Sequence, residues 1–78
     1  MKLKSMQDVE NFQHAIDECD NRVWLISGTD QFNLKDALTQ YVAIGRLISG
    51  DSELELFTES KDDEKYFLRM FTAYPEML

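Results

Sequence analysis

The sequence predicts one small α+β domain in which three helices pack on a three-stranded, mainly antiparallel sheet. Two observations lead to this fold class. Three segments repeat apolar residues every three or four positions, as amphipathic helices do, and three shorter segments are apolar throughout or alternate, as strands do. Their order along the chain is α-β-β-α-β-α. Since 78 residues suit one hydrophobic core and no repeat or linker divides them, residues 1–78 are expected to form a single domain.

The first helix is expected over residues 6–18. Ser5 is followed by Asp8 three positions later, which is the S-x-x-D pattern of a helix N-cap. The residues after it include one apolar stripe, made of Met6, Val9, Phe12, Ile16 and Cys19. The polar pair Asp20 and Asn21 marks the end of this helix.

Residues 23–27 are short, apolar and rich in strand formers, which predicts a buried strand. Residues 28–30 contain a glycine and predict a turn. Residues 31–34 allow two interpretations: they alternate as the second strand of a hairpin closed by a three-residue loop, or Asn33 caps a helix that begins at the next residue. We favour the hairpin, with the next helix capped near Asp36.

The second helix is expected to follow that cap and to end at Ser49. Gly50 is well placed for the left-handed conformation that closes helices. The helix has a broad apolar face, which consists of Ala37, Leu38, Tyr41, Val42, Ile44, Gly45 and Ile48. Because glycine inside a helix costs about 1 kcal/mol relative to alanine, Gly45 predicts a close approach to another backbone.

The third strand is expected over residues 53–56, where polar and apolar residues alternate strictly. This alternation places Leu54 and Leu56 inward, so Phe57 either points outward or marks a bulge. Residues 2–4 are a possible additional edge strand.

The last helix follows the cap signal of residues 60–63, whose acids suit the positive end of a helix dipole. Pro75 stops this helix. Its apolar stripe consists of Tyr66, Phe67, Met70, Phe71 and Tyr74.

The net charge of −7 is concentrated in residues 51–64, which carry −6. Direct nucleic-acid binding is not expected, because phosphate contacts require cations. The longest mainly apolar stretch, residues 41–48, is far shorter than the ~20 residues that cross a bilayer, and no apolar segment follows the basic N-terminus. With Cys19 as its single cysteine, the chain is expected in the reducing cytoplasm, away from membranes.

Candidates for catalysis or metal binding are few. His14 lies on the first helix with no nucleophile in an obvious setting, and Cys19 with one histidine does not supply the four ligands of structural zinc. Glu53 and Glu55 project from one strand face, which suits either Mg²⁺ or the solvated side of an edge strand. We favour the solvated face and expect no catalytic site and no cofactor.

The last helix is apolar around much of its circumference, which predicts burial on more than one side. Packing into the protein's own core is the favoured explanation, and contact with a partner or a second copy is the alternative. The candidate interaction surface combines these apolar residues with nearby acids: Phe67, Met70, Phe71, Tyr74, Met77, Glu53, Glu55, Asp62 and Asp63.

Four segments carry a family resemblance: Asn33-Leu34-Lys35, Gln40-Tyr41-Val42-Ala43-Ile44-Gly45, Glu53-Leu54-Glu55-Leu56-Phe57 and Met1-Lys2-Leu3-Lys4-Ser5-Met6. With them the chain resembles a small uncharacterised bacterial protein family often labelled "polyA polymerase". That activity needs a glycine-containing loop for phosphates and a nearby pair of metal-binding acids. The nearest equivalents, Ser27-Gly28 and Glu53 with Glu55, are a whole helix apart, so the activity is not expected here.

Three functions follow from these observations, in descending order of support. The first is a non-enzymatic protein-interaction or regulatory module, with the last helix as a possible homodimer contact. The second is an acidic inhibitor that mimics nucleic acid through residues 51–64. The third is a metal-dependent enzyme on nucleotides that uses Glu53 and Glu55.

Overall fold

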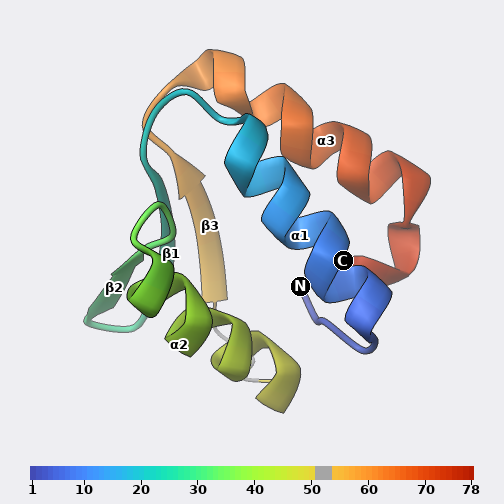
Figure 1. Cartoon of the computed structure of the whole chain (residues 1–78), viewed down its shortest axis with the longest axis horizontal. Helices are drawn as coiled ribbons and strands as arrows, with labels where there is room; N and C mark the ends of the chain where they lie inside the picture. The colour runs from blue at the N-terminus through green and yellow to red at the C-terminus, as the bar shows by residue number, and fades with distance from the viewer. Residues whose placement is uncertain (51–53) are drawn as a thin grey trace.

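The computed structural model describes residues 1–50 and 54–78 and confirms the predicted fold class and element order (Figure 1). The helices and strands are α1 (Met6–Glu18), β1 (Val23–Ser27), β2 (Asp30–Asn33), α2 (Ala37–Ser49), β3 (Leu54–Thr58) and α3 (Glu64–Ala73). Two short 3₁₀ turns flank α3: η1 (Lys61–Asp63) and η2 (Pro75–Met77).

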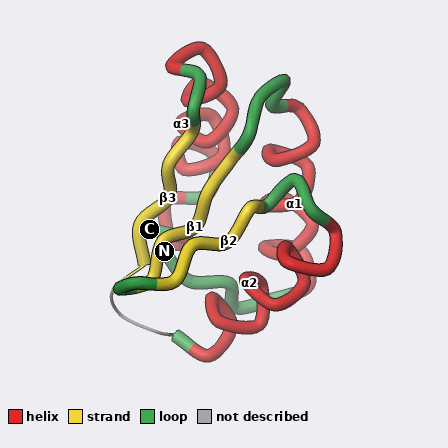
Figure 2. The backbone as a smooth tube through the Cα atoms, turned by 90° about the vertical axis from the view of Figure 1, so that its left-hand side faces the viewer, coloured by secondary structure: helices red, strands yellow, loops and turns green. Residues whose placement is uncertain are grey.

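The three strands form one antiparallel sheet in the order β2-β1-β3. Leu25 in the central strand pairs with Phe32 on one side and Leu56 on the other. The helices lie behind and beside the sheet in the view of Figure 2, so the domain has two layers. Helix α1 packs on α3, and α2 packs beside β2.

The core forms where the helices meet the inner face of the sheet. Val23 and Leu25 of β1 are fully buried there, while Trp24 between them faces the other side. This alternation is the period of two that the sheet requires. The largest fully buried side chains are Phe12, Ile16, Leu25, Leu34, Leu47, Met77 and Val23.

The ends of α1 and α2 confirm their cap signals, whereas neither Ser60 nor Asp63 makes a side-chain cap hydrogen bond before α3. The Ser5 hydroxyl accepts a hydrogen bond from the Asp8 amide at 3.1 Å, and the Asp36 carboxylate accepts one from the Leu38 amide at 3.3 Å. Gly50 adopts φ = 80° at the end of α2, a conformation that glycine reaches without a Cβ penalty. These residues therefore fix where α1 begins and where α2 begins and ends.

The hairpin is confirmed, but its loop is shorter than expected. Asp30 pairs with Ser27, so the loop has two residues, Gly28 and Thr29, in place of three. Gly28 has φ = 60°, as the first position of a type II′ turn requires. The turn therefore extends β2 by one residue toward the loop.

Two other expectations were wrong. Gly45 does not approach another backbone: a Cβ built on it meets nothing within 4 Å, so it faces open space. The N-terminal segment does not add a strand, since the Lys2 amide instead donates a hydrogen bond to the Met77 carbonyl at 3.0 Å. That bond joins the two ends of the described chain and buries Leu3 between them.

Candidate functional site

Part of the predicted interaction surface is core. Phe67, Met70 and Met77 are buried in the monomer, which corrects their assignment to a surface. Phe67 and Met70 turn inward because α1 covers this side of α3, where Phe67 meets Phe12 with ring centroids 6.2 Å apart, and Met77 lies in η2, which packs on α3. Phe71 is half-buried against the same cluster.

The acidic residues of the predicted interaction surface also differ in their exposure to solvent. Asp63 is buried, and its carboxylate accepts hydrogen bonds from the amides of Asp20 (3.2 Å) and Asn21 (3.0 Å). It is therefore a structural tie between η1 and the end of α1, and its assignment to the surface is corrected. Asp62 and Glu55 are exposed, and Glu53 lies outside the described residues.

Tyr74, the last residue of the predicted interaction surface, is half-buried against the core. His14, a candidate for catalysis or metal binding, is exposed. The His14 Nε2 lies 2.6 Å from Glu18 Oε1, one helical turn away. Cys19 is buried at the end of α1, where burial, followed by the negative charge of Asp63, raises the pKa of its thiol to about 11. Across residues 1–50 and 54–78, no three His, Cys, Asp or Glu side chains are grouped to hold a metal ion.

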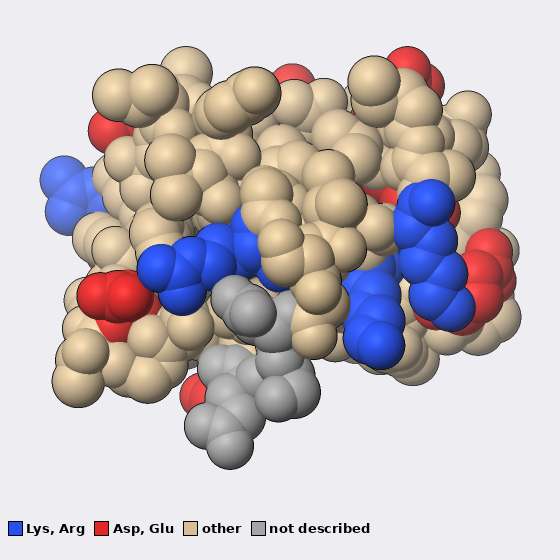
Figure 3. All heavy atoms as spheres, turned by 90° about the horizontal axis from the view of Figure 1, so that it is seen from below, with Lys and Arg blue, Asp and Glu red and all other residues tan. Residues whose placement is uncertain are grey.

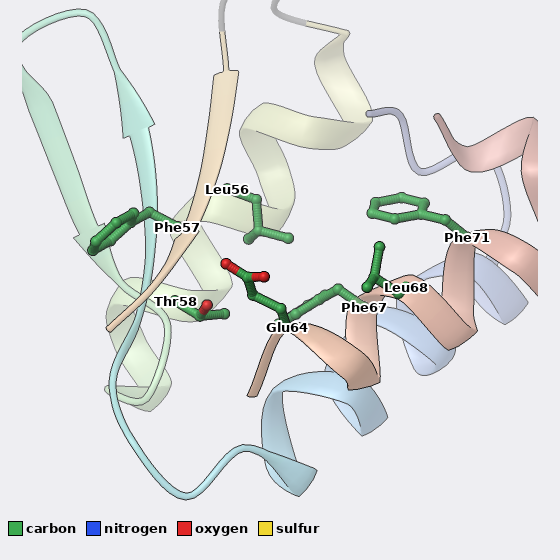
Figure 4. A pocket seen from close by; sticks show the side chains of 7 residues that line it. All are labelled: Leu56, Phe57, Thr58, Glu64, Phe67, Leu68 and Phe71. Carbon is green, nitrogen blue, oxygen red and sulfur yellow. The ribbon is translucent and has the colours of Figure 1, made fainter. Parts of the chain in front are cut away.

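A groove runs between β3 and α3 (Figure 4). It encloses about 250 Å³, and its walls are mostly apolar. Leu56 and the helix side chains point toward one another across it in the close-up view. The lining residues are Leu56, Phe57, Thr58, Glu64, Phe67, Leu68 and Phe71.

Two of these apolar residues are largely exposed: Leu68 by 63% and Phe57 by 53%. Leu68 lies on the rim of the groove, and Phe57 points to the opposite, open face of the sheet (Figure 4). An exposed aromatic beside an apolar groove is a common feature of surfaces that contact a partner.

The outer edge of β3 presents unpaired backbone groups to this groove. In an antiparallel pair, residues alternate between those bonded to the neighbouring strand and those facing away. The Glu59 amide donates to the Arg22 carbonyl at 3.1 Å, which fixes the alternation along β3. The N–H and C=O groups of Leu54, Leu56 and Thr58 therefore face outward, and nothing in the described part of the chain bonds to them.

Polar groups at the groove also lack partners. The Thr58 hydroxyl oxygen is buried and has no hydrogen bond to any residue that the structure describes. Glu64 on the groove wall and Glu55 on β3 form no ion pair with any described residue, whereas Glu59 accepts a hydrogen bond from Trp24 Nε1 at 2.9 Å. The groove thus combines an apolar floor, a free strand edge and one carboxylate, that of Glu64, without an ion pair among the described residues, while Glu55 projects from the opposite face of β3.

This groove is not predictable from the sequence, because it depends on the order in which the strands pair. The alternation of residues 53–56 predicted a half-buried strand, but only the order β2-β1-β3 makes β3 an edge beside α3. Phe57 was the available signal, since an apolar residue at an outward position is unusual on a solvated strand.

Comparisons with protein-family models, with curated proteins and with solved structures found no match. The resemblance described above therefore stays a prediction. None of the helices formed by residues 1–50 and 54–78 combines the length and apolar character needed to cross a membrane.

Proposed function

We propose that this protein is a non-enzymatic interaction module that binds an extended segment of a partner protein. The segment adds to β3 as a fourth strand and fills the groove beside α3. The observation that carries the proposal is the free edge of β3, whose outward N–H and C=O groups lie next to an apolar groove. Strand addition of this kind combines backbone hydrogen bonds for affinity with side-chain pockets for specificity.

The groove also defines the chemistry of the segment. Alternate side chains of an added strand point to opposite faces of the sheet. One set enters the groove between Leu56 and the exposed Leu68, so it is apolar. The other set lies on the open face beside Phe57. Because Glu64 and Glu55 have no ion-pair partner among the described residues, we expect at least one lysine or arginine in the bound segment.

Selection from a phage-displayed library of random peptides about ten residues long tests this function. We expect the enriched peptides to alternate apolar and polar residues and to contain a basic residue. No enrichment, or enrichment of acidic peptides without alternation, would overturn the proposal.

Amide hydrogen exchange then tests the mode of binding for the tightest selected peptide. Binding should slow exchange at Leu54, Leu56 and Thr58, whose amides face the free edge. The amides of Glu55 and Phe57 already bond to β1, so their exchange should change much less. Equal protection along the whole strand would contradict strand addition.

Two matched variants separate groove binding from a general effect on folding. Leu68→Glu places a charge on the rim of the groove, and Leu38→Glu makes the same change at an exposed leucine of α2, which does not line it. We expect Leu68→Glu to weaken peptide binding at least about tenfold and Leu38→Glu to leave it unchanged. Equal affinities for the two variants would place the bound peptide elsewhere.

A further inference from the structure

Helix α2 carries an exposed apolar stripe that the core does not use. Its buried side consists of Ala43, Ile44 and Leu47. On the opposite side, Leu38 is 74% exposed and Tyr41 77% exposed. The stripe consists of Leu38, Tyr41, Val42, Gly45 and Ile48, which share one face at the helical spacing of three and four.

The stripe continues past the end of α2. Ile48 lines a hollow of about 260 Å³ with the beginning of α1, where Met6 is also exposed. Arg46 does not interrupt the stripe: its guanidinium lies over the Phe32 ring at 5.4 Å and beside the Asp30 carboxylate at 3.6 Å, on the sheet side of the helix. The exposed face of α2 is therefore apolar from Leu38 to Ile48, and the exposed Ser49, whose hydroxyl donates to the Gly45 carbonyl at 2.9 Å, ends it.

We propose that this face is a homodimer contact whose occupant is the α2 stripe of a second copy. The stripe contains no charged residue, so a second copy offers an uncharged surface of the same kind. Helix α2 is also the one helix of the described chain without an acid, since α1 and α3 both contain them. Helix α2 itself therefore brings no acid into the contact when two copies that each carry −7 approach through this face.

The surface seen in Figure 3, on the side of the molecule where α2 lies, agrees with this distribution. Lys and Arg side chains form a broken band across its middle, and Asp and Glu lie mostly toward its margins.

The order of residues in the stripe suits a two-fold, antiparallel pairing. A symmetry axis midway between Val42 and Gly45 places each Val42 against the gap left by the other Gly45. The same axis sets Leu38 against Ser49 of the partner subunit, next to Ile48 of the partner subunit, so an apolar contact forms beside this polar end. Close approach at Gly45 explains why a glycine that faces open space occupies the middle of a helix.

The size of the contact sets its strength. A helix of 13 residues is about 20 Å long, so the stripe covers less than the ~800 Å² per partner of a standard interface. We expect a dissociation constant in the micromolar range, which sedimentation velocity at increasing protein concentration measures directly.

Gly45→Ala is the sharpest test. Alanine removes the gap that receives Val42, so we expect dimerisation to weaken at least about tenfold, while the dilute monomer becomes more stable. Leu38→Glu should abolish the dimer, and Leu68→Glu, on the groove, should leave it intact. A strict monomer at about 1 mM, or a dimer that neither α2 variant weakens, would overturn the proposal. Neither outcome bears on peptide binding at β3.

Discussion

Asp63 and Thr58 show how differently two buried polar side chains affect the same fold. The Asp63 carboxylate accepts hydrogen bonds from two backbone amides at the end of α1, whereas the Thr58 hydroxyl has no partner. A buried polar group stabilises a fold only when its hydrogen bonds are made. The two residues should therefore respond to substitution in opposite ways.

Asp63→Ala should destabilise the protein by about 2–3 kcal/mol, because it leaves the amides of Asp20 and Asn21 without an acceptor. Urea unfolding followed by circular dichroism measures the change. Asp62→Ala is the matched control, since Asp62 lies in the same 3₁₀ turn but is exposed. Equal stabilities of the two variants would show that Asp63 is not a structural tie.

Thr58→Val should raise the free energy of unfolding by about 1 kcal/mol, because valine keeps the shape and removes the unpaired hydroxyl. The same urea titration measures the gain. A loss of stability would mean that the hydroxyl is hydrogen-bonded in solution.

The Cys19 thiol makes the free energy of unfolding depend on pH in the alkaline range. The thiol has a pKa of about 11 in the folded protein against an ordinary value of 9.0. Between these values the unfolded chain releases the proton and the folded chain retains it, so stability falls as pH rises from about 9 to about 11. The stability advantage of the wild type over Cys19→Ala should therefore shrink between pH 8 and pH 10. An unchanged difference would contradict a raised pKa.

At the scale of elements, one glycine inside α2 and another at its C-cap have opposite roles. Gly50 needs its left-handed conformation to end the helix, whereas Gly45 has an ordinary helical conformation and open space around it. Relative to alanine, glycine destabilises a helix interior, but it adopts a left-handed conformation without the steric strain that a Cβ would cause. The two positions therefore separate folding requirements from those of the proposed dimer.

Gly45→Ala should stabilise the dilute monomer by up to about 1 kcal/mol, and Gly50→Ala should destabilise it by a similar amount. Thermal unfolding at a few micromolar, well below the concentration needed for the dimer, measures both. If Gly45→Ala were destabilising under these conditions, its effect on dimerisation would no longer report on packing between two copies.

The free edge of β3 and the exposed face of α2 are not equally visible in the sequence. The sequence predicts one broad apolar face for α2, but the structure buries only Ile44 of its seven residues and leaves the others exposed. The buried side consists instead of Ala43, Ile44 and Leu47, because this side of the helix meets β2 and the core. Where a helix is apolar around most of its circumference, the neighbouring elements decide which side is buried.

At the scale of the whole molecule, charge distinguishes the two proposed contacts. Self-association brings two copies of charge −7 together, whereas peptide binding joins the acidic groove to a basic segment. Salt screens both interactions, with a Debye length of about 10 Å at 0.1 M. The two equilibria should therefore respond to salt in opposite directions.

Raising NaCl from about 20 mM to about 200 mM should strengthen dimerisation and weaken peptide binding, each by roughly two- to fivefold. Sedimentation velocity measures the first equilibrium, and fluorescence anisotropy of a labelled selected peptide measures the second. The same direction of change in both would show that one of the two surfaces carries a different charge in the complex.

The sequence by itself determined the local structure of this protein. The caps at Ser5, Asp36 and Gly50, the stop at Pro75 and the two apolar periods fix the elements, because they act within a few residues of the chain. Only the tertiary structure decided which side chains remain at the surface. It buried Phe67, Met70, Met77 and Asp63, and it exposed the α2 stripe and the β3 edge, because exposure depends on how elements distant in sequence pack together.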